Sequence, residues 1–329
     1  MKPVDILFLS QEHVKNLDLP NDLLTQAIEN ALVEHARKTI EMPPKPGIHP
    51  SYENTFIHAM PAYLKRMNIC GIKWVAGFPG NHYYNLPNIS GLLILNDTQT
   101  GLPLAVMDCR WITTIRTALV SAIAARVCTK PIPEVLAIVG CGLQGRYHAR
   151  TIIEALPTIK AIRFIDIFES SMRRFQEETA KFFAGELLLC QQEQDCIADA
   201  DIIITCTPGD KPIVKNSWFK PGATGIGIEG GCAWEAEVLH SVDKFIVDDI
   251  PQAKHFETQG DFPGGMPAVY AELGDIIAEH KRGRELVQER ILITPLGLAI
   301  EDIAIAKLIY ETAIEHEVGI YLPLMREDL

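Results

Sequence analysis

The sequence predicts an α/β protein in which a doubly wound parallel sheet is joined to a smaller α+β domain. Apolar runs alternate with helix-compatible segments from about residue 135 to residue 248, and strand-like runs crowd residues 56–107. The 329 residues are enough for two domains, each with its own core. We place residues 1–118 and a returning segment, 300–329, in the first domain, and residues 119–299 in the second.

The first domain is expected to begin with a short strand at residues 4–9, followed by a helix that Ser10 caps. Residues 21–40 repeat apolar side chains with helical spacing, which predicts an amphipathic helix that ends before a proline cluster. An antiparallel meander is expected from four strand-like runs, at residues 56–60, 70–75, 91–96 and 103–107. The stretch 77–87, rich in aromatic residues and glycine, is either the wall of a binding site or a surface loop.

A connecting helix at residues 112–127 leads to the buried strand Val135–Val139 and then to a glycine turn, residues 140–145, that opens a helix. The later strands are expected at 162–168, 186–190, 201–206, 223–228 and 245–248, which gives a sheet of about six strands. A parallel sheet with such a turn after its first strand is typical of the Rossmann fold. An apolar helix from Gly297 to about Val318 is expected to return to the first domain.

The glycine turn is the clearest candidate for a binding site. Gly140 permits a tight turn, Gly142 lets a pyrophosphate approach bare backbone, and Gly145 lets the helix pack closely on the strand. The anion would then lie on the free N–H groups of the helix. The pattern therefore predicts a dinucleotide site.

Asp166 lies 21 positions after Gly145, close to the spacing at which such folds place a carboxylate on the adenosine ribose. Because that carboxylate would repel a 2′-phosphate, NAD(H) is favoured over NADP(H). Arg173 and Arg174 keep NADP(H) open, although a solvated helix face is the simpler interpretation of both.

Composition narrows the range of partners. With 47% hydrophobic and 22% charged residues, the chain has the balance of a soluble globular protein. A net charge of −12, without a basic run longer than two residues, argues against nucleic acid and anionic membranes. Residues 1–5 lack the profile of a signal peptide, so we expect a cytoplasmic protein. The eight cysteines are scattered, and we expect neither a disulfide framework nor a metal site.

Five separated motifs point to a family. They are Gly71-Ile72-Lys73 with Gly77-Phe78-Pro79-Gly80-Asn81, the segment Asp97 to Asp108, the run Thr113 to Ala118, the glycine turn, and Gly297 to Asp302. In this order, over nearly the whole chain, they resemble the ornithine cyclodeaminase/mu-crystallin family. The resemblance implies a homodimer joined through the N-terminal meander. It also implies NAD(H) or NADP(H) in the second domain and an amino or imino acid substrate between the domains.

The resemblance also assigns residues. Lys73 falls on the family's substrate-contacting lysine, which binds the substrate carboxylate or moves a proton at the imine. Arg116 falls on the family's arginine, whose planar fork suits a carboxylate. In addition to the glycines and Asp166, the candidate cofactor contacts are Thr117, Leu143, Gln144, Thr207 and Pro208.

Four positions depart from the cyclodeaminase pattern. Lys45 replaces an arginine, His58 replaces a glutamate, Glu229 replaces the catalytic aspartate, and Asn88 replaces a threonine. The distal ammonium of ornithine would need an acidic partner that His58 cannot supply, so we expect a substrate without a distal amine. Glu229 keeps a carboxylate, which could activate water or relay a proton.

The function that we expect is an NAD(H)-dependent oxidoreductase that transfers hydride at the α-carbon of an α-amino or α-imino acid. Two alternatives stay open. One is an ornithine cyclodeaminase-type lyase that uses NAD catalytically and releases ammonia. The other is a crystallin-like protein or accessory subunit that binds NAD(H) without turnover.

Overall fold

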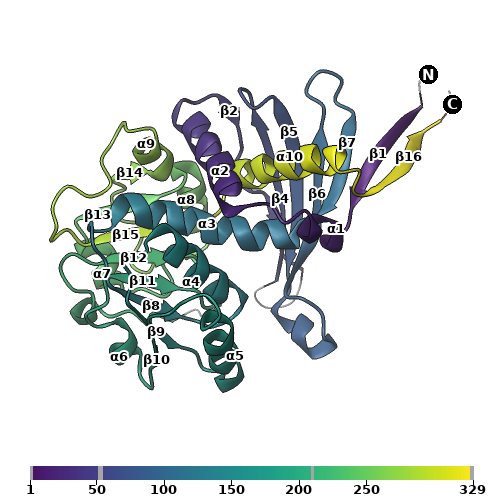
Figure 1. Ribbon diagram of the computed structural model, residues 1–329. Helices are drawn as coiled ribbons and strands as arrows, with labels where there is room; N and C mark the ends of the chain where they lie inside the picture. Colours follow the sequence, from purple (N-terminus) through teal and green to yellow (C-terminus); the bar gives the residue numbers. More distant parts are fainter. Residues whose placement is uncertain (1–2, 51–54, 209–210, 327–329) are drawn as a thin grey trace. The chain divides into compact units, whose positions relative to one another are not determined.

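The computed structural model describes residues 3–50, 55–208 and 211–326; Met1 and Lys2, which begin the run considered for a signal peptide, lie outside them. The chain divides into two compact units (Figure 1). The terminal unit comprises Met1–Arg116 and Leu298–Leu329, and the central unit is Thr117–Gly297. Each of these boundaries lies two residues from the position expected.

The terminal unit is built on a sheet of eight described strands, in the order β16-β1-β7-β6-β5-β4-β2, with β3 pairing β4. Their bounds are β1 (Val4–Leu9), β2 (Ile40–Glu41), β3 (Gly47–Ile48), β4 (Phe56–Leu64), β5 (Ile69–Gly77), β6 (Ile89–Asn96), β7 (Pro103–Asp108) and β16 (Ile320–Met325). Strands β4 to β7 pair antiparallel in sequence order, which confirms the predicted meander. β1 instead pairs parallel with β7.

Helices α2 (Asn21–Ala36) and α10 (Ala299–Glu315) lie in the terminal unit, and α10 packs on α2 and on β4, β5 and β6. The expected return of the C-terminal helix is therefore confirmed. Gly71 permits this close packing, because a Cβ there would lie 2.9 Å from Ile303 Cδ1. Side chains alternate along a strand, so Lys73 and Val75 of β5, both buried, face the same side as Gly71.

Four features of this unit confirm, refine or differ from the predictions. Ser10 caps the short helix α1 (Gln11–Asn16) as expected, its hydroxyl accepting the His13 N–H at 3.2 Å. The helix predicted to reach residue 40 ends at Ala36, because Lys38 takes a left-handed conformation and the chain then pairs with β4 as β2. Strand β16, which the sequence analysis missed, pairs antiparallel with β1. The stretch 77–87 contains a 3-10 helix, η1 (Pro79–Tyr84).

The central unit contains a parallel sheet in the order β10-β9-β8-β11-β12-β15-β13-β14. The strands are β8 (Val135–Val139), β9 (Ala161–Ile165), β10 (Glu186–Leu189), β11 (Ile202–Thr205), β12 (Thr224–Gly227), β13 (Lys244–Val247), β14 (Ala271–Glu272) and β15 (Ile291–Thr294). The doubly wound fold is confirmed, but the prediction of about six strands was wrong. The sequence analysis missed β14 and β15, and β15 inserts between β12 and β13.

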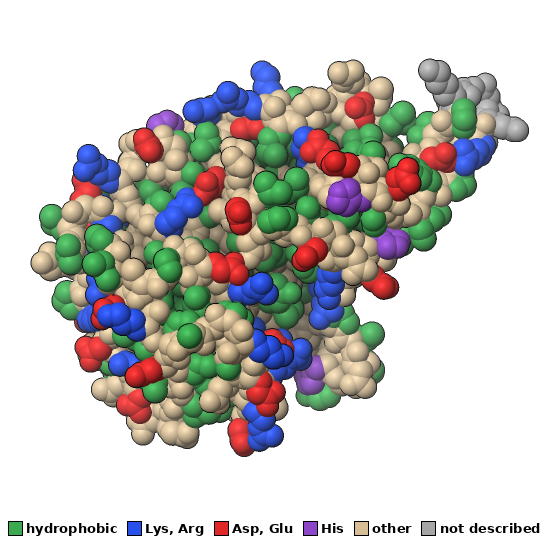
Figure 2. All heavy atoms as spheres, in the orientation of Figure 1, with side chains coloured by type: hydrophobic (Ala, Val, Ile, Leu, Met, Phe, Trp, Pro, Cys, Tyr) green, Lys and Arg blue, Asp and Glu red, His purple; other side chains and the backbone are tan. Residues whose placement is uncertain are grey.

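The remaining helical elements are α3 (Arg110–Cys128), α4 (Leu143–Ala155), α5 (Glu169–Thr179), α6 (Glu193–Ile197), η2 (Asn216–Trp218), α7 (Ala236–Ser241), α8 (Ile250–Glu257) and α9 (Leu273–Ile277). α3 is long and apolar enough to cross a membrane by length and composition, but 72% of its most apolar stretch is buried. That burial is typical of a core helix. On the face drawn in Figure 2, acidic and basic side chains are interspersed.

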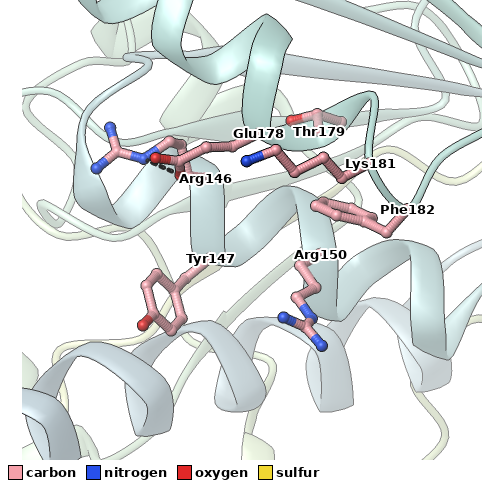
Figure 3. Close-up of a pocket in the computed structure, with 7 residues that line it drawn as sticks. All are labelled: Arg146, Tyr147, Arg150, Glu178, Thr179, Lys181 and Phe182. Atoms are coloured by element: carbon pink, nitrogen blue, oxygen red, sulfur yellow. Dashed lines mark ion pairs between the residues drawn. The ribbon is translucent and has the colours of Figure 1, made fainter.

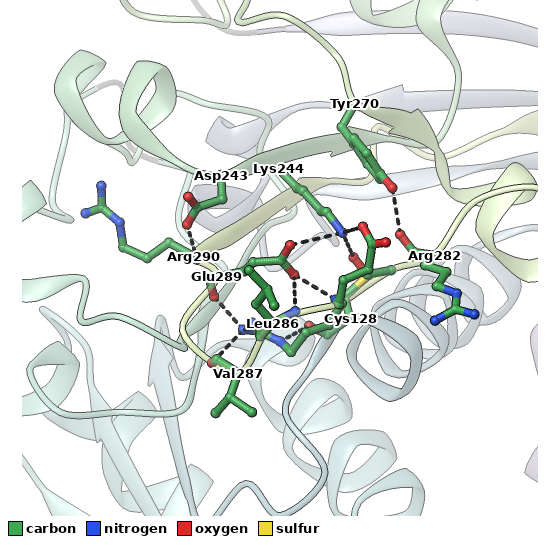
Figure 4. Close-up of polar contacts among 12 residues, drawn as sticks. Cys128, Asp243, Lys244, Tyr270, Arg282, Leu286, Val287, Glu289 and Arg290 are labelled. Atoms are coloured by element: carbon green, nitrogen blue, oxygen red, sulfur yellow. Dashed lines mark hydrogen bonds and ion pairs between the residues drawn. The ribbon is translucent and has the colours of Figure 1, made fainter.

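A polar network fastens the segment before β15 to the rest of the central unit (Figure 4). Lys244 is buried and pairs with Glu285 at 2.8 Å and Glu289 at 3.3 Å. Arg284 donates from Nε to the Cys128 carbonyl at 2.9 Å and from Nη2 to Thr224 Oγ1 at 3.1 Å. β15 has only four residues, and these bonds help to hold it in the middle of the sheet.

We therefore expect Arg284→Ala to destabilise the protein by about 1–3 kcal/mol, because it removes a partly buried guanidinium that donates to carbonyl groups of separate segments. The matched control is Arg282→Ala. Arg282 is exposed, and it contributes its backbone carbonyl, not its side chain, to the contact with Tyr270. Urea unfolding of both variants measures the difference, and equal midpoints would contradict the role given to Arg284.

Candidate functional site

In the glycine turn between β8 and α4, packing within the protein requires two of the glycines, whereas the third faces open space. Gly140 has φ +102°, and a Cβ on it would lie 2.5 Å from the Cys206 carbonyl oxygen. A Cβ on Gly145 would lie 2.0 Å from the Gly140 carbonyl oxygen. A Cβ on Gly142, in contrast, would meet nothing within 4 Å, so open space lies over this residue.

The N-terminus of α4 opens onto the same turn. Its N-cap is Gly142, and no side chain of the residues that the structure describes caps the helix. The first N–H groups of the helix therefore remain for another acceptor. Gln144 Oε1 is buried without a hydrogen-bond partner among the described residues, and the Leu143 side chain is exposed. The free N–H groups at this helix end fit the pyrophosphate of a dinucleotide.

Asp166 lies beside the glycine turn, directly after β9. Its Oδ2 accepts the Cys141 N–H at 2.7 Å, and its Oδ1 accepts the Phe168 N–H at 2.9 Å. β9 ends at Ile165 and not at Phe168 as predicted, so the carboxylate belongs to the loop at the carboxyl edge of the sheet. That edge is where open α/β sheets bind ligands.

The two arginines that could recognise a 2′-phosphate are engaged elsewhere. Arg173 pairs with Glu169 at 3.1 Å and Arg174 with Glu178 at 2.7 Å along α5, and both arginine side chains are exposed. Each pair joins residues four apart on the helix. Both arginines therefore lie on a solvated face of α5, which was the simpler interpretation of the sequence.

A pocket of about 450 Å³ lies between α4 and α5 (Figure 3). The residues that line it are Arg146, Tyr147, Arg150, Glu178, Thr179, Lys181 and Phe182. Arg146 pairs with Glu178 at 2.8 Å and donates from Nη1 to the Cys141 carbonyl at 3.2 Å. Arg146 thus fastens the glycine turn to α5.

A second polar group lies at the carboxyl edge of the central sheet. Glu229 follows β12, and its Oε1 accepts the Thr205 hydroxyl of β11 at 2.5 Å. The same hydroxyl oxygen accepts Trp234 Nε1–H at 3.1 Å. Glu229 Oε2 and Thr207 Oγ1 are both buried without a partner in the part of the chain that the structure describes. Pro208, next to Thr207, is exposed.

Burial raises the pKa of the Glu229 carboxyl to about 8, and the hydrogen bond from Thr205 offsets only part of that effect. A carboxyl group that titrates near neutral pH can both donate and accept a proton. Its position and its shielded oxygen make Glu229 the best-placed acid or base at this edge.

In the terminal unit, Lys73 and Arg116 converge on one carboxylate. Lys73 Nζ lies 2.6 Å from Asp302 Oδ2, and Arg116 Nε lies 3.3 Å from Asp302 Oδ1. Arg116 Nη1 also lies 3.4 Å from Glu301 Oε2. All four residues are buried, and they come from β5, α3 and α10. Burial lowers the pKa of Lys73, Asp302 opposes that shift, and Arg116 adds to it.

Sequence reasoning did not assign Glu301 and Asp302 to the site. The signal that could have found them is the adjacent acid pair in the Gly297 to Asp302 motif. Two neighbouring carboxylates at the start of an apolar helix are unusual in a core, where an unpaired charge is costly.

The other predicted substrate residues lie in the same unit. His58 pairs with Gly47 of β3 across the sheet, stacks on Phe56 at 4.3 Å, and faces the same side of β4 as Met60, which lies opposite Lys73. Lys45 is half-buried before β3. Asn88 is exposed, and its carbonyl accepts the Phe78 N–H at 2.8 Å. Thr117, a predicted cofactor contact, is half-buried on α3.

The raised pKa of Glu229 predicts how stability changes with pH. The folded protein binds the proton more tightly than the unfolded chain, whose glutamates titrate near about 4.3. The stabilisation is fully present below that value and is lost as pH rises through about 8. Glu229→Gln removes this titration, so its Tm relative to wild type should rise by about 5 °C between pH 5 and pH 9.

The exposed Glu237 provides the control for this measurement. Glu237→Gln should keep a constant Tm difference from wild type across the same pH range. A constant difference for Glu229→Gln as well would mean that its carboxyl titrates normally.

Comparison with known proteins agrees with this geometry. The profile of the ornithine cyclodeaminase/mu-crystallin family matches residues 4–317. Alanine dehydrogenase of Archaeoglobus fulgidus is 34% identical, over 98% of this chain and 100% of its own.

Two solved structures have the same fold over nearly the whole chain. An archaeal alanine dehydrogenase dimer with bound NAD superimposes with a TM-score of 0.88 at 32% identity, covering 98% of this chain and 100% of that one. The Delta(1)-pyrroline-2-carboxylate reductase of Thermococcus litoralis, in complex with NADH and L-proline, gives 0.87 at 29% identity, covering 96% and 100%. The resemblance inferred from the five motifs is thus confirmed: the chain belongs to the ornithine cyclodeaminase/mu-crystallin family.

Proposed function

We propose that this protein is an NAD(H)-dependent oxidoreductase that transfers hydride at the α-carbon of an α-amino or α-imino acid. The observation that carries the proposal is the pair of buried cations, Lys73 and Arg116, which the Asp302 carboxylate holds side by side in the terminal unit. Charge-assisted hydrogen bonds from such cations are among the strongest that a carboxylate ligand can accept. The relatives support the same chemistry, since one is an alanine dehydrogenase and another is a pyrroline-2-carboxylate reductase solved with NADH and proline.

Each proposed role follows from the surroundings of the residue. Arg116 and Lys73, with Lys45 assisting, bind and orient the substrate carboxylate. Glu229, whose pKa lies near 8, holds or delivers the proton at the substrate nitrogen. Lys73 is the second candidate for that proton, because burial lowers the pKa of its ammonium.

For the cofactor we propose NAD(H), bound by its pyrophosphate over Gly142 and the N-terminus of α4, with Asp166 on the adenosine ribose. When bound, the nicotinamide supplies or accepts the hydride. Gln144 and Thr207 have buried oxygens without a partner in the described part of the chain, and these suit further polar contacts. The salt bridges of Arg173 and Arg174 with glutamates support NAD(H) over NADP(H).

For the substrate we propose an amino or imino acid without a distal amine. His58 stacks on Phe56 at 4.3 Å, which gives this position an aromatic environment where a distal ammonium would need a carboxylate.

We also propose a cytoplasmic homodimer. Trp74 and Leu92 lie opposite each other on β5 and β6 and are 45% and 46% exposed. Both side chains point away from the face that carries Lys73 and α10. Exposed apolar pairs on an open sheet face favour a partner sheet, and the archaeal alanine dehydrogenase was solved as a dimer.

Absorbance at 340 nm tests the reaction. NADH is offered with a panel of 2-oxo acids plus ammonia or methylamine and with cyclic imino acids, and NAD is offered with the matching amino acids and ornithine. We expect net NADH oxidation with an imino acid. Ammonia release from ornithine without a net change would establish the cyclodeaminase instead, and NAD binding without either signal would establish a binding protein.

Gly142→Ala tests the cofactor site separately from the fold. The added Cβ meets no atom of the described residues within 4 Å, so Tm should stay within about 1 °C, while loss of the close approach should weaken NADH binding about tenfold or more. Gly80→Ala is the control, because a Cβ there also meets nothing within 4 Å. NADH fluorescence titration measures both variants. Unchanged affinity in Gly142→Ala would remove the glycine turn from the cofactor site.

A further inference from the structure

The motif that opens α10 carries two carboxylates with different surroundings. Both Glu301 and Asp302 are completely buried in the first turn of the helix, where the macrodipole favours negative charge. Glu301 Oε2 accepts the Leu298 N–H at 3.1 Å, which is the reach-back of an N3 residue to the start of its own helix. Asp302 points instead to side chains of β5 and α3.

Asp302 bridges two cations through different oxygens. Its Oδ2 lies 2.6 Å from Lys73 Nζ and its Oδ1 lies 3.3 Å from Arg116 Nε. Both cationic side chains are at least nine-tenths buried, so without this carboxylate two like charges would lie close together with little water to screen them. A single short side chain thus fixes the spacing of the two cations.

The groups that face Lys73 can be named for every element packed against it. Met60 on β4 and Leu93 on β6, its cross-strand partners, are apolar. Thr113 of α3 accepts from Lys73 Nζ at 3.4 Å. The Cys109 thiol stays neutral through the physiological range, because burial raises its pKa to about 11. Arg116 and Asp302 complete the set.

We propose that Asp302 is a positioning residue, which holds the Lys73 ammonium and the Arg116 guanidinium side by side in their charged forms, ready for a substrate carboxylate. The inference rests on the proposed function for its substrate, but the ion pairs themselves do not depend on it. Glu301 has a different role, because it contacts Arg116 and its carboxylate accepts the Leu298 N–H at the start of α10. The two adjacent acids therefore provide a matched pair of variants.

Asp302→Asn keeps the size of the side chain and removes its charge. Lys73 then loses its counter-ion and keeps Arg116 as a neighbour, so its ammonium loses the proton at a lower pH. Glu229, whose pKa is about 8, sets one alkaline limb of the kcat/KM profile. We expect a separate limb, set by Lys73, to move to lower pH by at least about one unit. Glu301→Gln, which can still accept the Leu298 N–H, should leave that limb within about 0.3 unit of wild type.

A second readout does not need turnover. NMR titration of protein carrying lysine labelled with ¹³C at Cε follows the Lys73 ammonium directly, and Lys73→Arg identifies its resonance. We expect the Lys73 titration to move to lower pH in Asp302→Asn and to stay near the wild-type value in Glu301→Gln. Asp302→Ser, which is smaller, should shift it in the same direction and serves if the asparagine variant does not fold.

The two readouts keep the inference and the proposed function apart. If wild type turns over an imino acid but both the limb set by Lys73 and the Lys73 titration are the same in Asp302→Asn as in wild type, Asp302 has no positioning role. If wild type shows no turnover at all, the proposed function fails, and the NMR shift alone decides whether Asp302 keeps Lys73 charged.

Discussion

The terminal unit depends on the ion pairs among Lys73, Arg116, Glu301 and Asp302. Arg116 and Asp302 are 186 positions apart, and the central unit is the chain that lies between them. Arg116 is the last residue of the first segment of the terminal unit, and the acid pair follows within a few residues of the return at Leu298. The buried ion pairs therefore join the end of the first segment of the terminal unit to the start of its second segment. The apolar α10, packed on β4, β5 and β6, excludes water from them.

The central unit follows a different rule. Its polar groups lie where parallel strands end, because the carboxyl edge of such a sheet leaves loops free to bind. The turn after β8 and the loop after β9 place open space over Gly142 next to the Asp166 carboxylate. At β11 and β12 the same edge holds Thr205 and Glu229, and here one carboxylate oxygen is shielded and has no partner among the described residues. Such a group is costly in a folded protein, which is the usual sign that a ligand or a reaction uses it.

The features that the sequence predicted correctly are those that depend on residues close together in the chain. Ser10, the glycine turn and the alternating strands of the meander act through neighbours close in the chain, so the sequence pattern indicates them directly. β15 was missed because four apolar residues between polar loops, Ile291–Thr294, give no period. Its central place depends on Arg284 and Lys244, whose partners are far away in the sequence. The pairing of Asp302 with Lys73 and the raised pKa of Glu229 are both consequences of burial, which a single sequence does not reveal.

The central claim is that hydride passes between the cofactor and the α-carbon of the substrate. The most direct test uses NADH carrying deuterium at C4, prepared separately on each face, with the imino acid that consumes NADH. The amino acid product is then analysed by mass spectrometry and NMR. The account predicts one deuterium per product molecule at the α-carbon, from one face only. Product without deuterium, or ammonia release with no NADH consumed, would contradict it.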